Sequence, residues 1–537
     1  MTLARANPRP IDTLEGVDAS AASRALRFDR SSGILLHPTS LASRFGVGDF
    51  GSSARAFADF LHAAKQRIWH ILPIGPTGDS FSPYQACSTF AGNPLLVSPE
   101  LLAERGYFSK ALLRNVPRFP AERVGFREVA KYKGSLLQKA FAGFSPDAEF
   151  RRFELRNANW LECYAKFMAL REANHERSWT QFDPSLKPES RTVDFHKFAQ
   201  FEFFRQWDSL RQYARSLNIR MMGDMPFYVQ HDSADVWARP DYFDLAADGA
   251  PRTIGGVPPD AFSDEGQSWG NPTYRWGRME SDGFAWWIAR FRATLERVGI
   301  LRIDHFRGFE AFWEIPADAS NAKSGRWVKA PGLELFRAVT KALGDLPVVA
   351  ENLGVITPDV EDLRNEFELP GMAVLQFAFD SDNVHRPYNY ERNTVAFTGT
   401  HDNNTSRGWW AGLQRAARKD AGARAQLAAA AAFLQTDGRN VHWNMIRAVI
   451  NSVAQICIVP AQDVLGLGAS GRMNVPGVAE GNWAWRALPG AFTPELAKRL
   501  ASITEAAGRA HDEDPIRGFV AERARTTREP EQALASD

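Results

Sequence analysis

The chain has 537 residues, with 64 Lys and Arg against 63 Asp and Glu, which gives a formal net charge of +1. So even a balance argues against a dedicated nucleic-acid-binding protein, which would carry a basic stripe or tail. A composition of 44% hydrophobic and 24% charged residues is typical of a globular chain with a large core, and it excludes disorder as the main state.

The predicted strands are short apolar runs of about 4–8 residues, the pattern of strands that are buried on both faces in a parallel sheet. They follow an N-terminal extension, residues 1–29, which contains no apolar run of signal-peptide length. In chain order the runs are Gly33–His37, Ile68–Ile74, Ile219–Met225, Leu301–His305, Val348–Leu353, Met372–Phe377, Thr394–Thr400 and Gln455–Val464.

Amphipathic segments with terminal signals predict helices between these strands. Ser53–Lys65 places apolar residues on one face behind a serine N-cap. Ala285–Val298 has the same pattern, and Gly299 is predicted to end it at the C′ position. Pro358–Phe367 has Thr357 as its predicted N-cap and proline at its first position.

Eight strands with helices between them predict an α/β fold, a (β/α)₈ TIM barrel. An open doubly wound sheet gives a similar pattern, but the glycine-rich nucleotide-binding motifs are missing from the sequence. We expect the barrel over residues 30–490, with a helical insertion over about 101–217 between the second and third strands. Residues 491–537 are predicted to form a C-terminal helix and a polar tail.

The cysteines and the hydropathy pattern bear on the cellular compartment. Cys87, Cys163 and Cys457 lie far apart and form no CxxC pair, which suits a reducing compartment rather than a disulfide or zinc framework. No segment approaches the roughly 18–20 uninterrupted apolar residues of a membrane span. We therefore expect a cytoplasmic protein that contacts neither membrane nor nucleic acid.

Three acidic residues follow predicted strands: Asp304 in LRIDHFR, Glu351 in VVAENLG and Asp402 in FTGTHDNNT. Any one of them could equally be a helix N-cap or a loop anchor. The C-terminal ends of barrel strands converge on one cleft, however, and these acids are accompanied by Arg302 and His401. Together they favour an active site.

Paired carboxylates in a barrel cleft suggest glycoside chemistry. A retaining mechanism needs carboxyl groups about 5–5.5 Å apart, and an inverting one about 6.5–9.5 Å, and the sequence leaves both open. Arg302 is predicted to keep Asp304 ionised, while neighbouring acids hold Glu351 protonated. A fourth acid, Asp224 in MGDMP, ends the third predicted strand, and we assign it a structural role.

At this point the sequence resembles a known family over about residues 30–486, with its motifs in the same order. The family is glycoside hydrolase family 77 of the α-amylase clan, the 4-α-glucanotransferases, also called amylomaltases or disproportionating enzymes. The motifs that carry the resemblance are GILLHPTSL, ILPIGPTG, SPYQACSTFAGNPLL, GDMPFYV, SADVWA, GGVPPDAFS, GQSWGNP, RIDHFRGFEAFWEIP, AENLGVITPDV, GMAVLQFAFD, TGTHDNNT and RMNVPG with GNWAWR.

The resemblance implies a role for each matching residue. It implies Asp304 as nucleophile, Glu351 as general acid/base and Asp402 as the carboxylate that stabilises the oxocarbenium-like transition state. It implies a lid loop over about residues 255–271. The substrate-binding residues that it implies are Arg302, His401, Tyr84 against the sugar of the −1 subsite, Trp269 on the acceptor side, Asp380 and Asn474.

One position departs from the family pattern, since Asn352 follows Glu351 where the family usually has aspartate. The resemblance implies transfer of α-1,4-glucan segments to the 4-OH of glucose or a maltodextrin by a retaining double displacement. It implies no metal and no other cofactor, and a monomer or a homodimer. The alternatives are an α-amylase-type hydrolase and a non-catalytic glucan-binding barrel. The lid favours transfer, and a binding barrel has no reason to keep all three acids.

Overall fold

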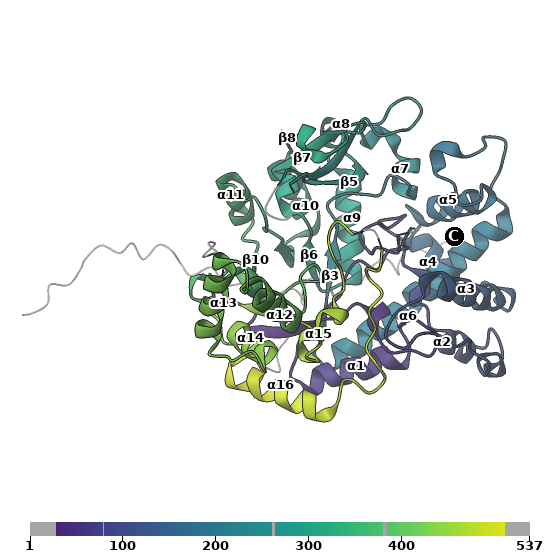
Figure 1. Ribbon diagram of the computed structural model, residues 1–537. Coiled ribbons are helices and arrows are strands. Elements are labelled where there is room, and N and C mark those ends of the chain that lie inside the picture. Colours follow the sequence, from purple (N-terminus) through teal and green to yellow (C-terminus); the bar gives the residue numbers. More distant parts are fainter. Residues whose placement is uncertain (1–27, 79, 260–263, 380–383, 479, 511–537) are drawn as a thin grey trace, which may run out of the picture.

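A computed structural model describes residues 28–78, 80–259, 264–379, 384–478 and 480–510 (Figure 1). Its centre is an eight-stranded parallel sheet in the order β10-β11-β12-β1-β2-β3-β6-β9. The N–H of Ala350 donates to the carbonyl of Pro370 at 2.9 Å, which brings the last strand against the segment that leads into the first. The strands are β1 (Ser31–Leu35), β2 (Ile68–His70), β3 (Arg220–Met225), β6 (Ile300–Ile303), β9 (Val348–Ala350), β10 (Gly371–Val374), β11 (Thr394–Phe397) and β12 (Ile456–Pro460).

The predicted barrel is confirmed, since each of the eight predicted runs overlaps one of these strands, and three of the strands begin one or two residues before the predicted run. Nearly every strand residue is buried, as expected for a parallel sheet that is covered on both faces. Most strands end before the predicted run does. At the C-terminal end of β6, β9 and β11 the chain leaves the ladder, and the acidic residues follow there.

The helices between the strands are where the periodicity predicted them, but two terminal signals were wrong. The first helix, α1 (Ser52–Ala63), begins after Gly51, whose N–H donates to Asp49 Oδ1 at 3.0 Å, so both serines lie within the first turn. Helix α9 (Ala285–Arg297) ends because Val298 is extended, and the N–H of Gly299, directly before β6, donates to the carbonyl of Met221 in β3. The helix therefore ends because the chain joins the sheet at Gly299, and Gly299 is not a C′ cap.

Thr357, the predicted N-cap of the third helix, is at the N-cap position but does not cap the helix through its side chain. Helix α11 (Pro358–Glu366) begins after Thr357, but the threonine side chain makes no capping bond to a described residue. The remaining helices outside the insertion are α7 (Ala234–Ala238), α8 (Trp276–Ser281), α10 (Gly332–Leu343), α12 (Ser406–Ala416), α13 (Ala421–Leu434), α14 (Val441–Ile450), α15 (Ala461–Val464) and α16 (Pro494–Ala506).

Two insertions flank the barrel (Figure 1). The segment between β2 and β3 is helical, as predicted, with α2 (Pro99–Glu104), α3 (Phe126–Ala142), α4 (Ala148–Arg156), α5 (Leu161–Ala173) and α6 (Ser190–Ser216). The segments between β3 and β6 and between β6 and β9 together form the second insertion, an antiparallel sheet in the order β5-β4-β7-β8 that the sequence did not predict. Its strands are β4 (Thr253–Val257), β5 (Gln267–Pro272), β7 (Ala311–Pro316) and β8 (Arg326–Lys329).

The predicted lid loop over 255–271 is therefore corrected in part, since β4 and β5 form a hairpin there. Residues 260–263, between the two strands, lie outside the described residues. None of the helices in the described ranges combines the length and the apolar content that a membrane span requires.

Arg509 ties the C-terminal segment to the barrel. Its side chain is fully buried, and among the described residues it donates to main-chain carbonyls alone, those of Ser31, Ile450, Ser452, Ala454 and Gln455. Methionine would fill the space but donate no hydrogen bond to these carbonyls, of which those of Ile450, Ala454 and Gln455 would keep a second donor. We expect Arg509→Met to lower the free energy of unfolding by about 3 kcal/mol.

Urea denaturation of the purified variant measures this loss. Arg439→Met is a suitable control, because the Arg439 side chain is 87% exposed and its loss should change stability by less than about 0.5 kcal/mol. Equal stability of the two variants would contradict the assignment of Arg509 as a structural anchor.

Candidate active site

The three predicted acids lie at one end of the barrel. Asp304 directly follows β6, Glu351 directly follows β9, and Asp402 lies in the loop between β11 and α12. β6 and β9 are paired neighbours, with Ile303 opposite Ala350, and β11 belongs to the same parallel sheet, so the C-terminal ends of the three strands present these side chains to the same cleft.

Arg302 is the central cation of the site. It lies in β6, is almost fully buried, and its Nη1 contacts Asp304 Oδ1 at 3.0 Å and Asp224 Oδ2 at 2.6 Å. The Tyr84 hydroxyl donates to the same Asp224 oxygen at 2.8 Å. Asp224 is thus a buried carboxylate that fixes both Arg302 and Tyr84. The structural role that we predicted for Asp224 is therefore incomplete, because this residue also orders two predicted substrate-binding side chains.

Tyr84 connects this network to the third acid. Its ring stacks on that of His401, with centroids 5.0 Å apart and planes at 24°. His401 Nε2 contacts Asp402 Oδ2 at 3.3 Å, and Asn474 Nδ2 donates to Asp402 Oδ1 at 2.6 Å. Burial alone would raise the pKa of Asp402, but His401, Asn474 and Arg302 together lower it to about 2. Asp402 is therefore ionised at neutral pH.

Glu351 is held by two main-chain donors. The N–H of His305 donates to Oε2 at 2.7 Å, and the N–H of Leu353 donates to Oε1 at 2.9 Å. His305 has a left-handed conformation with φ of 52°, which is uncommon for a residue with a side chain and is typical of functional sites. This turn, directly after Asp304, aims a main-chain N–H at the glutamate.

The two carboxyl groups beside Arg302 have separated pKa values. Burial raises the pKa of Asp304 to about 6, against the opposing effect of Arg302. Burial raises the pKa of Glu351 to about 8, opposed by Arg302 and reinforced by Asp304. At neutral pH Asp304 is mainly ionised and Glu351 mainly protonated, as predicted. The physical cause differs from the prediction, since burial exceeds the neighbouring acid in its effect on Glu351.

Trp269 lies on β5 of the antiparallel sheet, close to the Glu351 side of the site. Its ring packs edge-to-face against His305 at 5.0 Å and against Tyr228 at 6.0 Å. The second sheet thus brings an aromatic side chain against the turn that donates to Glu351. Asp380, the other predicted glucan-binding acid, lies outside the described residues.

The unusual Asn352 is engaged with neighbouring elements. Its Nδ2 donates to Glu361 in α11 at 2.8 Å, and its Oδ1 accepts from the N–H of Met372 in β10 at 2.7 Å. An aspartate could not donate to Glu361, so asparagine suits this position. Within the described ranges, no group of three or more His, Cys, Asp and Glu is placed to hold a metal ion.

The comparisons with known proteins decide the family. The glycoside hydrolase family 77 model, described as 4-alpha-glucanotransferase, matches residues 36–490. The chain belongs to this family. A 4-alpha-glucanotransferase of Synechocystis is 47% identical over 503 residues, covering 89% of this chain and 98% of that protein. One from Thermus thermophilus is 46% identical over 506 residues, covering 90% and 100%.

A solved structure of an amylomaltase has the same fold as this chain. The amylomaltase from Streptococcus agalactiae in complex with acarbose has a TM-score of 0.85 and 35% sequence identity, and the match covers 90% of this chain and 100% of that one. The resemblance seen in the sequence is therefore confirmed over residues 36–490, the range that the family model matches.

Proposed function

We propose that this chain transfers α-1,4-glucan segments to the 4-OH of glucose or another glucan, with Asp304, Glu351 and Asp402 as the catalytic residues. Relatives that match over 98–100% of their own length bear the name 4-alpha-glucanotransferase. The observation that carries the residue assignment is the pairing of Arg302 with Asp304 beside a Glu351 carboxyl held by two main-chain donors.

The first step forms a covalent intermediate. The Asp304 carboxylate attacks the anomeric carbon, and the glycosidic bond breaks as Glu351 gives its proton to the leaving oxygen. The leaving sugar departs with a free 4-OH. Asp402, ionised and fixed by His401 and Asn474, stabilises the positive charge that develops on the ring.

The second step reverses the first with a new sugar. Glu351, now a carboxylate, takes the proton of the acceptor 4-OH as that oxygen attacks the anomeric carbon, and Asp304 leaves as a carboxylate. The two inversions retain the α configuration. We propose that Tyr84 packs against the sugar of the −1 subsite, and its stacking on His401 and its bond to Asp224 support this role.

Transfer rather than hydrolysis requires that a sugar outcompete water at the intermediate. Trp269 supports this, because its ring lies against His305, whose N–H holds Glu351. An acceptor sugar that receives help from Glu351 would meet this aromatic side chain. We propose that the hairpin of β4 and β5 forms the acceptor wall, and that residues 30–490 form the catalytic unit.

Incubation with maltotriose tests the proposed reaction. Transfer predicts glucose together with a ladder of maltodextrins both shorter and longer than the substrate, with a constant number of reducing ends. Hydrolysis predicts only shorter products and a rising number of reducing ends. The second result would replace the proposal with the α-amylase-type alternative.

The pKa values predict a bell-shaped dependence of kcat/KM on pH. Asp304 must be ionised, and its pKa of about 6 means that activity falls as the pH drops below that value. Glu351 must be protonated in the first step, and its pKa of about 8 means that activity falls as the pH rises above that value. Initial rates with maltotriose across this range measure both limbs. A rate that keeps rising above pH 8 would contradict the role of Glu351 as the acid.

A further inference from the structure

Two segments that are distant in the sequence hold the Asp402 carboxylate and the amide that contacts it. Asp402 belongs to the loop after β11, and Asn474 follows the short helical turn Ala469–Gly471, 72 residues later. The N–H of Asn474 donates to the carbonyl of His401 at 3.2 Å. The position of the carboxylate therefore depends on how firmly these two segments are joined.

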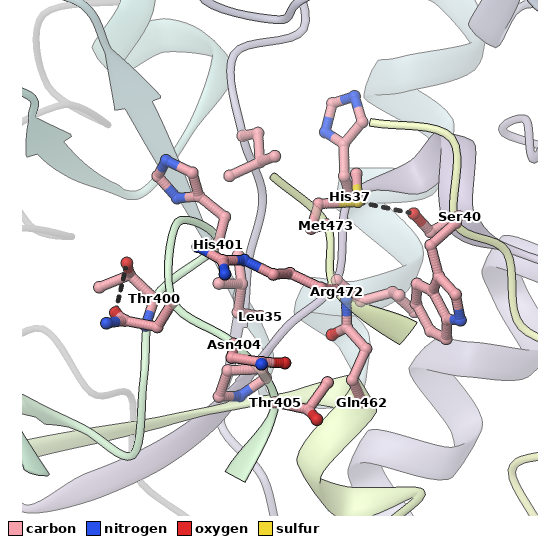
Figure 2. A pocket seen from close by; sticks show the side chains of 15 residues that line it. Leu35, His37, Ser40, Thr400, His401, Asn404, Thr405, Gln462, Arg472 and Met473 are labelled. Carbon is pink, nitrogen blue, oxygen red and sulfur yellow. Dashed lines mark hydrogen bonds between the residues drawn. The ribbon is translucent and has the colours of Figure 1, made fainter. Parts of the chain in front are cut away.

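Arg472 joins them through main-chain atoms. Its Nη2 donates to the carbonyl of Asp402 at 2.6 Å, and its Nε donates to the carbonyl of Asn474 at 2.7 Å. In Figure 2 the Arg472 side chain extends toward the loop that carries Thr400 and His401, along the wall of a small cavity of about 20 Å³. One guanidinium thus spans the gap between the two segments.

The chemistry of this contact requires arginine. Partial burial lowers the pKa of Arg472, and Asp402 opposes that change, but a guanidinium stays charged at neutral pH. Its planar fork presents Nε–H and Nη–H in fixed directions, so both carbonyls are satisfied by one rigid group. A lysine has a single ammonium group at the end of its side chain, so it could donate to only one of the two carbonyls at a time.

We propose that Arg472 is a positioning residue for the transfer reaction, holding Asp402 and Asn474 in fixed relation to the sugar of the −1 subsite. The proposal rests on the function proposed above. Arg472 bonds to main-chain carbonyls and acts on the sugar only through Asp402 and Asn474. Asp402 lies deep in the cleft, but 46% of its side chain is exposed to the cleft itself, so its orientation depends on hydrogen bonds rather than on close packing.

Arg472→Met tests the proposal, since methionine keeps much of the bulk but donates no hydrogen bond. Misplacement of a reacting or stabilising group by about 1 Å costs about 100-fold in rate. We expect kcat to fall by about that factor, with KM for maltotriose changed less than about threefold. The loss should be equal with α-glucosyl fluoride, because Asp402 works with any leaving group.

Two further variants separate positioning from a general loss of structure. Arg407→Met is the matched control, since Arg407 donates from an exposed position to the carbonyl of Gly466 at 2.7 Å, and its loss should leave kcat unchanged. Arg472→Lys keeps the charge and one possible bond, so its kcat should lie between those of the wild type and Arg472→Met. Wild-type kcat in a folded Arg472→Met protein would overturn the proposal.

A double-mutant cycle with Asp402→Asn tests whether Arg472 acts through Asp402, with fluoride release from α-glucosyl fluoride as the sensitive readout. We expect Arg472→Met to cause less than about a threefold further loss in the Asp402→Asn protein, because the group that it positions is already impaired. Fully multiplied losses would overturn the proposal. Wild-type activity of Asp402→Asn itself would instead refute the proposed catalytic role of Asp402.

Discussion

Replacing Asp304 with asparagine is expected to lower kcat/KM for maltotriose by about 10,000-fold or more, because the amide cannot form the covalent bond to the anomeric carbon. The asparagine side chain keeps the size of the aspartate and can still accept a hydrogen bond from Arg302, which lies 3.0 Å from the carboxylate in the wild-type protein. Glucose release from maltotriose, followed with high enzyme concentration, measures the residual rate.

A buried acid with a structural partner provides the control for this variant. Asp49 is paired with the buried Lys133 at 3.3 Å, far along the chain from the three acids. Asp49→Asn should lower the melting temperature but leave kcat per folded molecule near that of the wild type. Asp304→Asn should show the opposite pattern. A folded Asp304→Asn protein that releases glucose at a near-normal rate would exclude Asp304 as the nucleophile.

The barrel could be predicted because its strands are buried on both faces and therefore appear as apolar runs. The antiparallel sheet could not, because its strands lack that signal. TIGGV of β4 and QSWGNP of β5 contain glycines where strand residues are expected. The structure explains one of them, since a Cβ on Gly256 would lie 2.1 Å from the carbonyl of Gln267 on the paired strand. Close approach of two backbones, rather than a loop, required glycine there.

The candidate site was predictable where the signal was local. Asp304, Glu351 and Asp402 each follow a strand whose end is visible in the sequence. Asp224 lies within the ladder, one residue before the end of β3, but its importance comes from contacts with Arg302 and Tyr84, 78 and 140 residues away. Arg472 shows no local pattern, since one of its two contacts is with a carbonyl 70 residues earlier.

The predicted protonation states of Asp304 and Glu351 agree with their pKa values, but the prediction considered only neighbouring charges and not burial. The sequence placed Arg302 near Asp304 and other acids near Glu351, which gives the order of the two pKa values. It did not supply the burial, which is the largest contribution for both groups. Burial follows from the closed barrel and from the insertions that surround it, and these are properties of the folded chain.

Glu351→Gln should separate the acid step from the rest of the mechanism. Glutamine cannot protonate the leaving sugar, so kcat/KM for maltotriose should fall by about 1,000-fold or more. Fluoride leaves without protonation, so α-glucosyl fluoride should restore the first step to within about tenfold of the wild type. The second step lacks its base, and the glucosyl ester on Asp304 should therefore accumulate. Intact-protein mass spectrometry measures it as the addition of one anhydroglucose unit.

Asp402→Asn is the control that tells the two carboxylates apart. The Asp402 carboxylate, ionised and fixed by His401 and Asn474, stabilises charge on the ring whichever group leaves. Its variant should be slow with maltotriose and equally slow with α-glucosyl fluoride, and no ester should accumulate. Rescue of Asp402→Asn by the fluoride, together with a lack of rescue for Glu351→Gln, would show that the acid is Asp402. The two main-chain donors to Glu351 would then serve to hold a structural carboxylate.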